Sequence, residues 1–469
     1  MRFPKLASAL VLVSALCLAQ VEFPNTPAGH QCAAWLQSFN RGDRGAHRNF
    51  LQNNAPSRLT HLDREMELRR TTGGVDLKKV QESTPTKIAV MVQERLSEQF
   101  ALLTMEVQAE KPHQITAMEL NAIPRPAEFP LPHLGESELV AATKKYIDKQ
   151  VVSDDFSGAV MIAKGGKAVM AQAYGLADRE HNIPNTLKTR FRIGSMNKMF
   201  TAVATLQLAE AQKLDLKDTV GKYLTDYPNK DVASKVTIQQ LLKHTGGTGD
   251  IFGPEFAEHR LELRTLEDYV RLYRNRGLKF EPGTRWEYSN YGFILLGLII
   301  EKASGQSYYD YVREHIFERA GMSSTGSEPE DAAVANRSIG YTKMESSTWT
   351  PNTQTLPYRG TSAGGGYSTV EDLTRFAEAL TGHKLLDILY TDMLTNGKPG
   401  TPDNSYAYGF QDRLVNGTRC FGHGGGAPGM NGDLRICPGI GYVVAVLANL
   451  DPPAANRVSE FIVNRLPEK

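Results

Sequence analysis

The chain has 469 residues, of which 41% are apolar and 22% charged, and its formal net charge is +1. This length exceeds what one compact core usually supports, so it predicts two or three domains. The balance of acidic and basic side chains gives no electrostatic reason to expect a nucleic acid or an acidic membrane surface as a partner.

The first residues have the pattern of an export signal. Arg2 and Lys5 precede a short apolar run, LASALVLVSALCLA, which ends in small residues. This pattern predicts a signal peptide at residues 1–19 that is cleaved after Ala19. A single membrane anchor is the alternative, but the run is short for a bilayer. We therefore expect an exported protein, periplasmic or extracellular, with no integral membrane segment in its mature form.

Residues 20–122 predict a small α+β domain. The stretches HQCAAWLQSFNRGD and DREMELRRTTGG have helical patterns and each ends at a glycine. Three alternating runs follow, KIAVMVQER, EQFALLTMEVQ and HQITAMELNAI, and their period of two predicts an antiparallel sheet. Helices followed by a curled sheet resemble the cone-shaped, cystatin-like fold of the nuclear transport factor superfamily. The resemblance implies an accessory domain that binds a partner or self-associates.

The remaining chain predicts a sheet domain interrupted by helices. Residues 123–136 hold four prolines and predict a stiff linker. Within residues 137–469, two alternating runs joined by Gly165-Gly166 predict a hairpin, and DLRICP and YVVAVLANL predict strands near the end. Residues from about 215 to 345 are mostly helical in pattern. Strands on both sides of a helical subdomain favour one shared sheet, with a ligand site in the cleft beside it.

The cysteines are too few for a disulfide scaffold. Cys17 lies in the predicted signal peptide, which leaves Cys32, Cys420 and Cys437. The last two flank the turn GAPGMNG and could pair across a hairpin, although free thiols are equally compatible with the pattern. No spacing of cysteine and histidine suggests a metal site, and no cofactor is expected.

The stretch FRIGSMNKMF places a serine and a lysine three residues apart. Gly194 and the helical pattern that follows put Ser195 at a helix N-terminus, where free amides and the helix dipole favour developing negative charge. Lys198 shares the same face of this helix. The alternative is that Ser195 only caps the helix and Lys198 is a solvated side chain.

Two further motifs could complete a site. Tyr288-Ser289-Asn290 follows the turn element EPG and precedes an apolar helix, so a loop could aim its side chains into the cleft. His423 begins an H-x-G triplet on a predicted glycine-rich strand, where a substrate backbone could approach closely. A flexible glycine turn with a surface histidine is the alternative there. The similar stretch KHTGG, with His244, precedes helical pattern rather than a C-terminal strand, so we do not expect it in the site.

From about residue 140 to 469, the order S-x-x-K, Y-x-N, H-x-G resembles the serine hydrolases built on the class C β-lactamase fold. This group includes penicillin-recognising D-alanyl-D-alanine carboxypeptidases, D-aminopeptidases and carboxylesterases. The stretches KYLTDYPNKDVASKVTIQQLLKHTGG, SAGGGYSTVEDLTRFAEAL and VVAVLANLDPP fit the same family. The resemblance implies a two-subdomain β-lactamase/transpeptidase-like α/β fold, in which helices flank an antiparallel sheet and a helical subdomain is inserted.

The resemblance also implies a mechanism. Ser195 would be the nucleophile that forms an acyl-enzyme, and Lys198 with Tyr288 would take its proton. The two groups titrate as a pair, so which member is the general base stays open. The backbone amides of Ser195 and Gly426 would stabilise the oxyanion. Water would then release the acyl group.

The substrate-binding residues implied by the resemblance are Asn290, His423, Gly424 and Gly425. His423 departs from class C β-lactamases, which have a lysine there. Histidine is mostly neutral at pH 7, so it offers a substrate carboxylate no permanent cation. We therefore expect a small ester, amide or D-amino-acid peptide as substrate, with at most weak β-lactam hydrolysis. A D-alanyl-D-alanine carboxypeptidase or a class C β-lactamase is the alternative.

Two rival hypotheses concern function. The stretch GTSAG matches the G-x-S-x-G elbow of α/β-hydrolases, with Ser362 as nucleophile, but the preceding NTQTLPYRG lacks the apolar strand that this elbow needs. A non-catalytic binder of peptidoglycan fragments is a hypothesis of a different class. The presence of all three motifs argues against a degenerate site.

Overall fold

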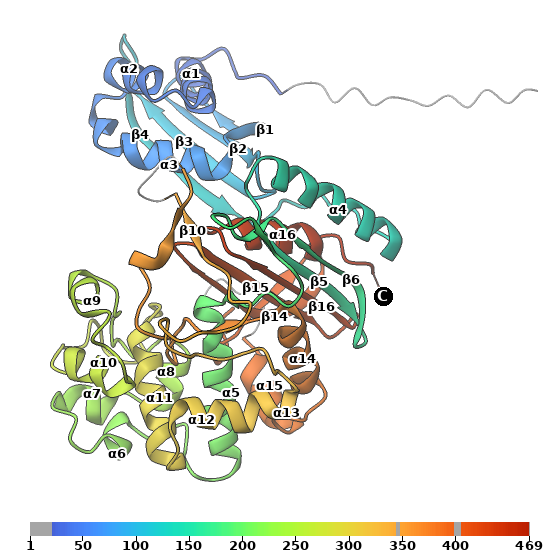
Figure 1. Ribbon diagram of the computed structural model, residues 1–469. Coiled ribbons are helices and arrows are strands. Elements are labelled where there is room, and N and C mark those ends of the chain that lie inside the picture. The colour runs from blue at the N-terminus through green and yellow to red at the C-terminus, as the bar shows by residue number, and fades with distance from the viewer. Residues whose placement is uncertain (1–20, 344–347, 398–404, 469) are drawn as a thin grey trace, which may run out of the picture. The chain divides into compact units, whose positions relative to one another are not determined.

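The computed structural model describes residues 21–343, 348–397 and 405–468 (Figure 1). The predicted signal peptide, residues 1–19, lies outside these ranges. The chain divides into two compact units, Met1–Pro130 and Leu131–Lys469. None of the helices in the described ranges combines the length and the apolar character needed to cross a bilayer.

In the first unit, helices precede an antiparallel sheet whose strands follow chain order. The helical elements are α1 (Pro27–Arg41), α2 (Arg44–Asn54), the 3-10 turn η1 (Pro56–His61) and α3 (Leu62–Thr72). The strands are β1 (Val75–Ser83), β2 (Lys87–Glu94), β3 (Phe100–Val107) and β4 (Ile115–Ile123). The predicted helices correspond to α1 and α3, which end at the left-handed glycines Gly42 and Gly73. The sequence patterns missed α2 and the mostly exposed edge strand β1.

The second unit is built on an antiparallel sheet with the order β13-β14-β15-β16-β5-β6. Its strands are β5 (Gly158–Lys164), β6 (Lys167–Tyr174), β13 (Gln411–Val415), β14 (Thr418–Ala427), β15 (Met430–Cys437) and β16 (Tyr442–Ala448). Gly165 and Gly166 form the predicted hairpin turn, and both have positive φ. Strand β16 pairs with β5, so the beginning and the end of this unit share one sheet. The predicted fold class is confirmed.

Helices cover both faces of this sheet (Figure 1). Helices α4 (Glu136–Val152) and α16 (Ala454–Val463) contact one another and strands of the sheet, whereas α5 (Asn197–Glu210) and α14 (Val370–Thr381) belong to the other core. The other helical elements are α6 (Val220–Tyr223), α7 (Lys230–Lys235), α8 (Ile238–Leu242), α9 (Pro254–His259), α10 (Leu266–Tyr273), α11 (Asn290–Ser304), α12 (Tyr308–Val312), η3 (Arg313–Phe317), α13 (Glu318–Ala320), η4 (Asn352–Gln354) and α15 (Ile388–Thr395). Short strands complete the unit: β7 (Leu176–Asp178), β8 (Ile183–Pro184), β9 (Phe191–Arg192), β10 (Tyr341–Thr342), β11 (Thr350–Pro351) and β12 (Tyr367–Ser368).

Two buried helices in contact position the motif residues. Every residue of α5 except Glu210 is buried, and so is α11 from Asn290 to Ile300. A helix that is buried all round cannot shift without opening the core. The first turns of these two helices therefore hold their side chains in fixed places.

Strands β14 and β15 are joined by a disulfide between Cys420 and Cys437. The neighbouring residues Phe421 and Ile436 are directly paired, so the two cysteines lie opposite each other across the hairpin. Of the two possibilities that the sequence left open, a disulfide or free thiols, the structure contains the disulfide. Cys32 is a free, buried thiol in the first unit.

Candidate active site

Ser195 lies on a tight turn at the start of α5. The 3-10 turn η2 (Gly194–Met196) leads directly into the helix, and neither start has a side-chain cap. The capping alternative for Ser195 therefore fails. Gly194 has a φ of 52°, and a Cβ atom there would lie 2.9 Å from the backbone nitrogen of Gly426. Only glycine combines this conformation with so close an approach of strand β14.

The amine of Lys198 is fully buried among oxygen atoms. Its Nζ lies 3.2 Å from Ser195 Oγ, 2.7 Å from Asn290 Oδ1 and 2.5 Å from the carbonyl oxygen of Ala363. Burial disfavours the charged form and lowers the pKa of Lys198 to about 7, although the carboxylate of Asp250 acts in the opposite direction. A large fraction of this amine is therefore neutral at physiological pH.

The phenol of Tyr288 completes the group around Ser195. The Lys198 Nζ lies 4.6 Å from the centre of its ring. Burial raises the pKa of Tyr288; the neighbouring hydroxyl of Ser195 opposes this rise, and the charge of Asp250 adds to it. Tyr288 therefore keeps its proton at neutral pH and can donate it.

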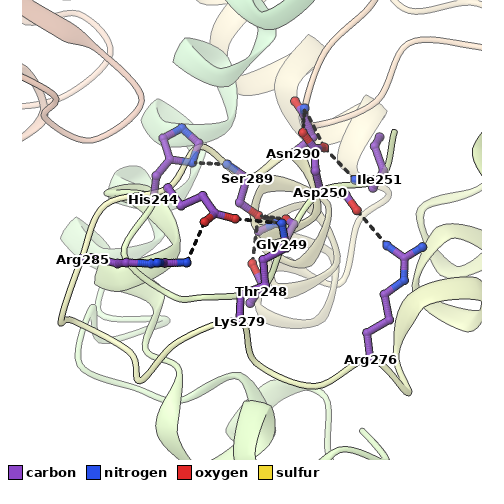
Figure 2. A network of polar contacts seen from close by, with 12 residues as sticks. His244, Thr248, Gly249, Asp250, Ile251, Arg276, Lys279, Arg285, Ser289 and Asn290 are labelled. Carbon is purple, nitrogen blue, oxygen red and sulfur yellow. Dashed lines mark hydrogen bonds and ion pairs between the residues drawn. The ribbon is translucent and has the colours of Figure 1, made fainter. Parts of the chain in front are cut away.

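Asn290 is held in one orientation by a carboxylate (Figure 2). Its Nδ2 donates to both oxygens of Asp250, at 2.9 and 3.2 Å. This leaves Oδ1 facing the amine of Lys198. If the amide were flipped, its NH2 group would face that amine, and hydrogen-bond donors would meet with no acceptor between them. Asp250 also accepts from the backbone nitrogen of Ile251, and its own carbonyl accepts from Arg276.

Strand β14 borders the site with an open edge. Its pairing with β13 ends at Gly422 within the described residues. Beyond that point Gly425 approaches the serine turn so closely that a Cβ atom would lie 3.0 Å from the backbone nitrogen of Ser195. The amides of Ser195 and Gly426, both predicted oxyanion donors, thus belong to segments in direct contact.

The ring of His423 is buried, and both of its nitrogens have hydrogen-bond partners. Its Nε2 lies 3.0 Å from the hydroxyl of Tyr406, and its Nδ1 lies 2.5 Å from the carbonyl oxygen of Gly424. Burial, assisted by the charge of Lys198, lowers the pKa of His423 to about 3. The ring is therefore neutral throughout the physiological range. A hydrogen bond from this ring to a substrate, as predicted, would require one of these two contacts to open.

The beta-lactamase family model matches residues 143–467, which is well over half of the chain. The chain belongs to the beta-lactamase family. Two relatives come from Bacillus subtilis (strain 168): the penicillin-binding protein PbpX is 33% identical over 277 residues, and penicillin-binding protein 4* is 32% identical over 296 residues. These alignments cover 59% and 58% of this chain and 66% and 64% of the relatives, less than two thirds of either relative's length.

Solved structures agree with this membership. A penicillin-binding protein from Bacillus halodurans is 34% identical, with a TM-score of 0.61 over 67% of this chain and 98% of that one. A D-stereospecific amidohydrolase from a Streptomyces species is 28% identical, with a TM-score of 0.58 over 70% of this chain and 98% of that one. These findings place the chain among the serine hydrolases of the beta-lactamase fold. They do not test the cystatin-like resemblance of residues 20–122, which stays a prediction.

The rival nucleophile is inaccessible in this beta-lactamase-family site. Ser362 is fully buried, and its hydroxyl has no hydrogen-bond partner in the described parts of the chain. It lies against Gly297 of α11, where a Cβ atom would come within 2.4 Å of its Oγ. Its neighbour Ala363 contributes to the site only through a backbone carbonyl.

Sequence reasoning missed two side chains at the site. Asp250 orients Asn290, and His244, which we did not expect there, packs its ring 4.4 Å from that of Tyr288, centre to centre. His244 Nδ1 also accepts from the backbone nitrogen of Ser289 (Figure 2). The stretch ending in KHTGG, which fits the family, contains His244 and was the available signal for it; Asp250 follows that stretch by three residues.

We expect Asp250→Asn to slow the reaction of Ser195 and to alter its pH dependence. The change removes a negative charge that favours the protonated amine, so the pKa of Lys198 should fall and activity should persist to lower pH. The rate itself should fall roughly 10–100-fold, because a buried hydrogen bond to a charged group contributes about 1.5–3 kcal/mol. The measurement is the rate of fluorophosphonate labelling as a function of pH.

Asp231→Asn is the control, since Asp231 forms an ion pair with Lys235 on the exposed surface of α7. An acid limb at the same pH in Asp250→Asn and wild type would contradict the assignment of Asp250.

Proposed function

We propose that this chain hydrolyses ester or amide bonds of substrates without a free carboxylate through an acyl-enzyme on Ser195. The observation that supports this most strongly is the environment of Lys198. Its buried amine lies 3.2 Å from the serine hydroxyl and within 2.7 Å of two oxygen atoms that can only accept hydrogen bonds.

Hydrogen-bond counting favours Lys198 as the general base. A neutral amine has two N–H groups and one lone pair. The carbonyl of Ala363 and the Oδ1 of Asn290 take the two N–H groups, so the lone pair is left for the hydroxyl proton of Ser195. The pKa of about 7 supplies this neutral form near the pH at which a base works best. Tyr288, with its raised pKa, is better suited to donate a proton.

The proposed reaction runs in two steps. Ser195 Oγ attacks the substrate carbonyl carbon while its proton moves to Lys198, and the backbone amides of Ser195 and Gly426 stabilise the oxyanion. The bond to the leaving group then breaks, and the leaving group takes a proton from the Tyr288 hydroxyl, which Lys198 restores. In the second step a water molecule attacks the acyl carbon and gives its proton to Lys198. The bond to Ser195 Oγ then breaks, Lys198 returns the proton to this oxygen, and the acid leaves.

The surroundings favour substrates without a free carboxylate. His423 is neutral and buried, so it provides no cation at the edge of β14. Trp286, with 49% of its surface exposed, lies 6.4 Å from Tyr288 between ring centres and offers an apolar contact beside this tyrosine. Short-chain esters and D-amino-acid amides fit both features, because neither class has a free carboxylate. The solved D-stereospecific amidohydrolase is consistent with the second class.

Export of the mature chain is part of the proposal. It rests on the sequence pattern of residues 1–19, and the disulfide between Cys420 and Cys437 supports it, because such bonds persist in oxidising compartments. We also propose that residues 20–122 form an accessory domain that binds a partner or self-associates.

Ser195→Ala should abolish covalent labelling by a fluorophosphonate and lower ester hydrolysis by several orders of magnitude, because the nucleophile is lost. Ser362→Ala is the matched control and should leave both signals near the wild-type level. The measurements are mass spectrometry of the labelled peptide and p-nitrophenyl ester turnover. Fluorophosphonate labelling of Ser195→Ala would contradict the proposal. A wild-type protein that is not labelled would favour the non-catalytic binder.

A substrate panel tests the preference for substrates without a free carboxylate. We expect kcat/KM for short-chain p-nitrophenyl esters to exceed that for nitrocefin by roughly 10–100-fold, since a charge-assisted hydrogen bond to the nitrocefin carboxylate, worth about 1.5–3 kcal/mol, is missing. Rates of Ser195→Ala provide the background for each substrate. The reverse ranking would show that the site supplies a cation to carboxylate-bearing substrates and would support the β-lactamase alternative.

A further inference from the structure

Three side chains next to the catalytic group form a continuous chain of hydrogen bonds. His244 Nε2 lies 3.0 Å from the hydroxyl of Tyr406, and the same hydroxyl lies 3.0 Å from His423 Nε2. The two histidines are 1% and 2% exposed, so water does not compete for these contacts. Neither His244 nor Tyr406 takes part in the proposed reaction.

The backbone fixes the direction of every bond in this chain. The N–H of Ser289 donates to His244 Nδ1, at 3.1 Å, so the ring proton of His244 sits on Nε2 and is donated to Tyr406. The Tyr406 hydroxyl must then donate to His423 Nε2. The remaining nitrogen, His423 Nδ1, donates its proton to the carbonyl of Gly424. The two histidines thus carry opposite tautomers.

The chain of bonds connects segments that carry different parts of the site. His244 follows α8, packs against Tyr288 and Phe293, and holds the backbone between Tyr288 and Asn290. His423 lies on β14, three residues before the Gly426 amide.

We propose that His244 and Tyr406 are positioning residues, which keep His423 as a neutral imidazole protonated on Nδ1 and tie strand β14 to the loop of Tyr288. The inference deepens the proposed function, on which its kinetic consequence rests. The tautomers can be tested without any substrate.

The charged and titratable groups around these three hydrogen-bonded side chains favour the neutral form of each of them. Burial lowers the pKa of His423, and the charges of Lys198, Arg435 and Arg413 add to this effect, while its bond to the Gly424 carbonyl opposes it. Burial likewise lowers the pKa of His244, with Lys198 and His423 contributing. Burial and the neighbouring Tyr288 raise the pKa of the Tyr406 hydroxyl. Acidification to about pH 5 therefore leaves the ring of His423 neutral, and the pKa of His244 is shifted in the same direction.

The direct test is nuclear magnetic resonance of the full chain labelled with ¹⁵N-histidine. Two-bond ¹H–¹⁵N correlations should show the Nε2–H tautomer for His244 and the Nδ1–H tautomer for His423, unchanged between about pH 5.5 and 8. His244→Gln and His423→Gln assign the signals. Two Nε2–H tautomers, or titration of either ring with a pKa near its ordinary value of about 6.5, would overturn the proposal.

Tyr406→Phe tests the role of the connecting hydroxyl. It should disturb both histidine signals and lower kcat for ester hydrolysis about 10-fold with a smaller change in KM, because two buried nitrogens lose their partner. Tyr408→Phe is the matched control, since the Tyr408 hydroxyl accepts from Gln239 and contacts neither histidine among the described residues, so the variant should resemble wild type. Unchanged signals and kcat in Tyr406→Phe would refute the positioning role. An inactive wild type with the expected tautomers would refute the proposed function alone.

Discussion

The burial of one lysine amine is the constraint on which the site depends. A charged ammonium with no exposed surface is costly, so the protein can tolerate Lys198 only by shifting it toward its neutral form and by supplying partners for its N–H groups. Those partners are the carbonyl of Ala363 and the Oδ1 of Asn290. The same arrangement leaves the lone pair of the amine beside Ser195, so one buried group accounts for both the packing and the chemistry.

The surrounding fold follows from the need to hold this amine. Lys198 is buried because it lies on α5, a helix of which almost every residue is buried. Helix α11 presents Asn290 from its first turn. Asp250 then fixes the orientation of Asn290, without which a donor could face the amine. Glycines at 194 and 425 let strand β14 approach the serine turn to within van der Waals contact. The burial of Lys198, the orientation of Asn290 and the close approach of β14 thus belong to one arrangement around the amine.

The sequence predicted the parts of this arrangement that depend on local pattern. Ser195 and Lys198 meet because residues three apart share a helix face, and the hairpin at Gly165-Gly166 follows from turn preferences. The turn element before Tyr288 selected the right Y-x-N triplet. These predictions needed no knowledge of distant contacts.

What the sequence could not supply depends on tertiary neighbours. The segment with His244 has the local signature of a turn, and only packing brings its ring against Tyr288. Histidine at position 423 was expected to be mostly neutral from its ordinary pKa, but its burial and its bond to Tyr406 depend on residues outside its own strand. The edge strand β1 was missed because its exposed polar residues mask any alternation.

The most direct test of the central claim is the pH dependence of the single-turnover acylation of Ser195 by an activated ester. If the buried amine of Lys198 is the general base, the acylation rate should be half-maximal near pH 7 and reach a plateau above it. A rate that rises only toward the ordinary tyrosine pKa of about 10, or that does not change between about pH 5 and 9, would contradict this account.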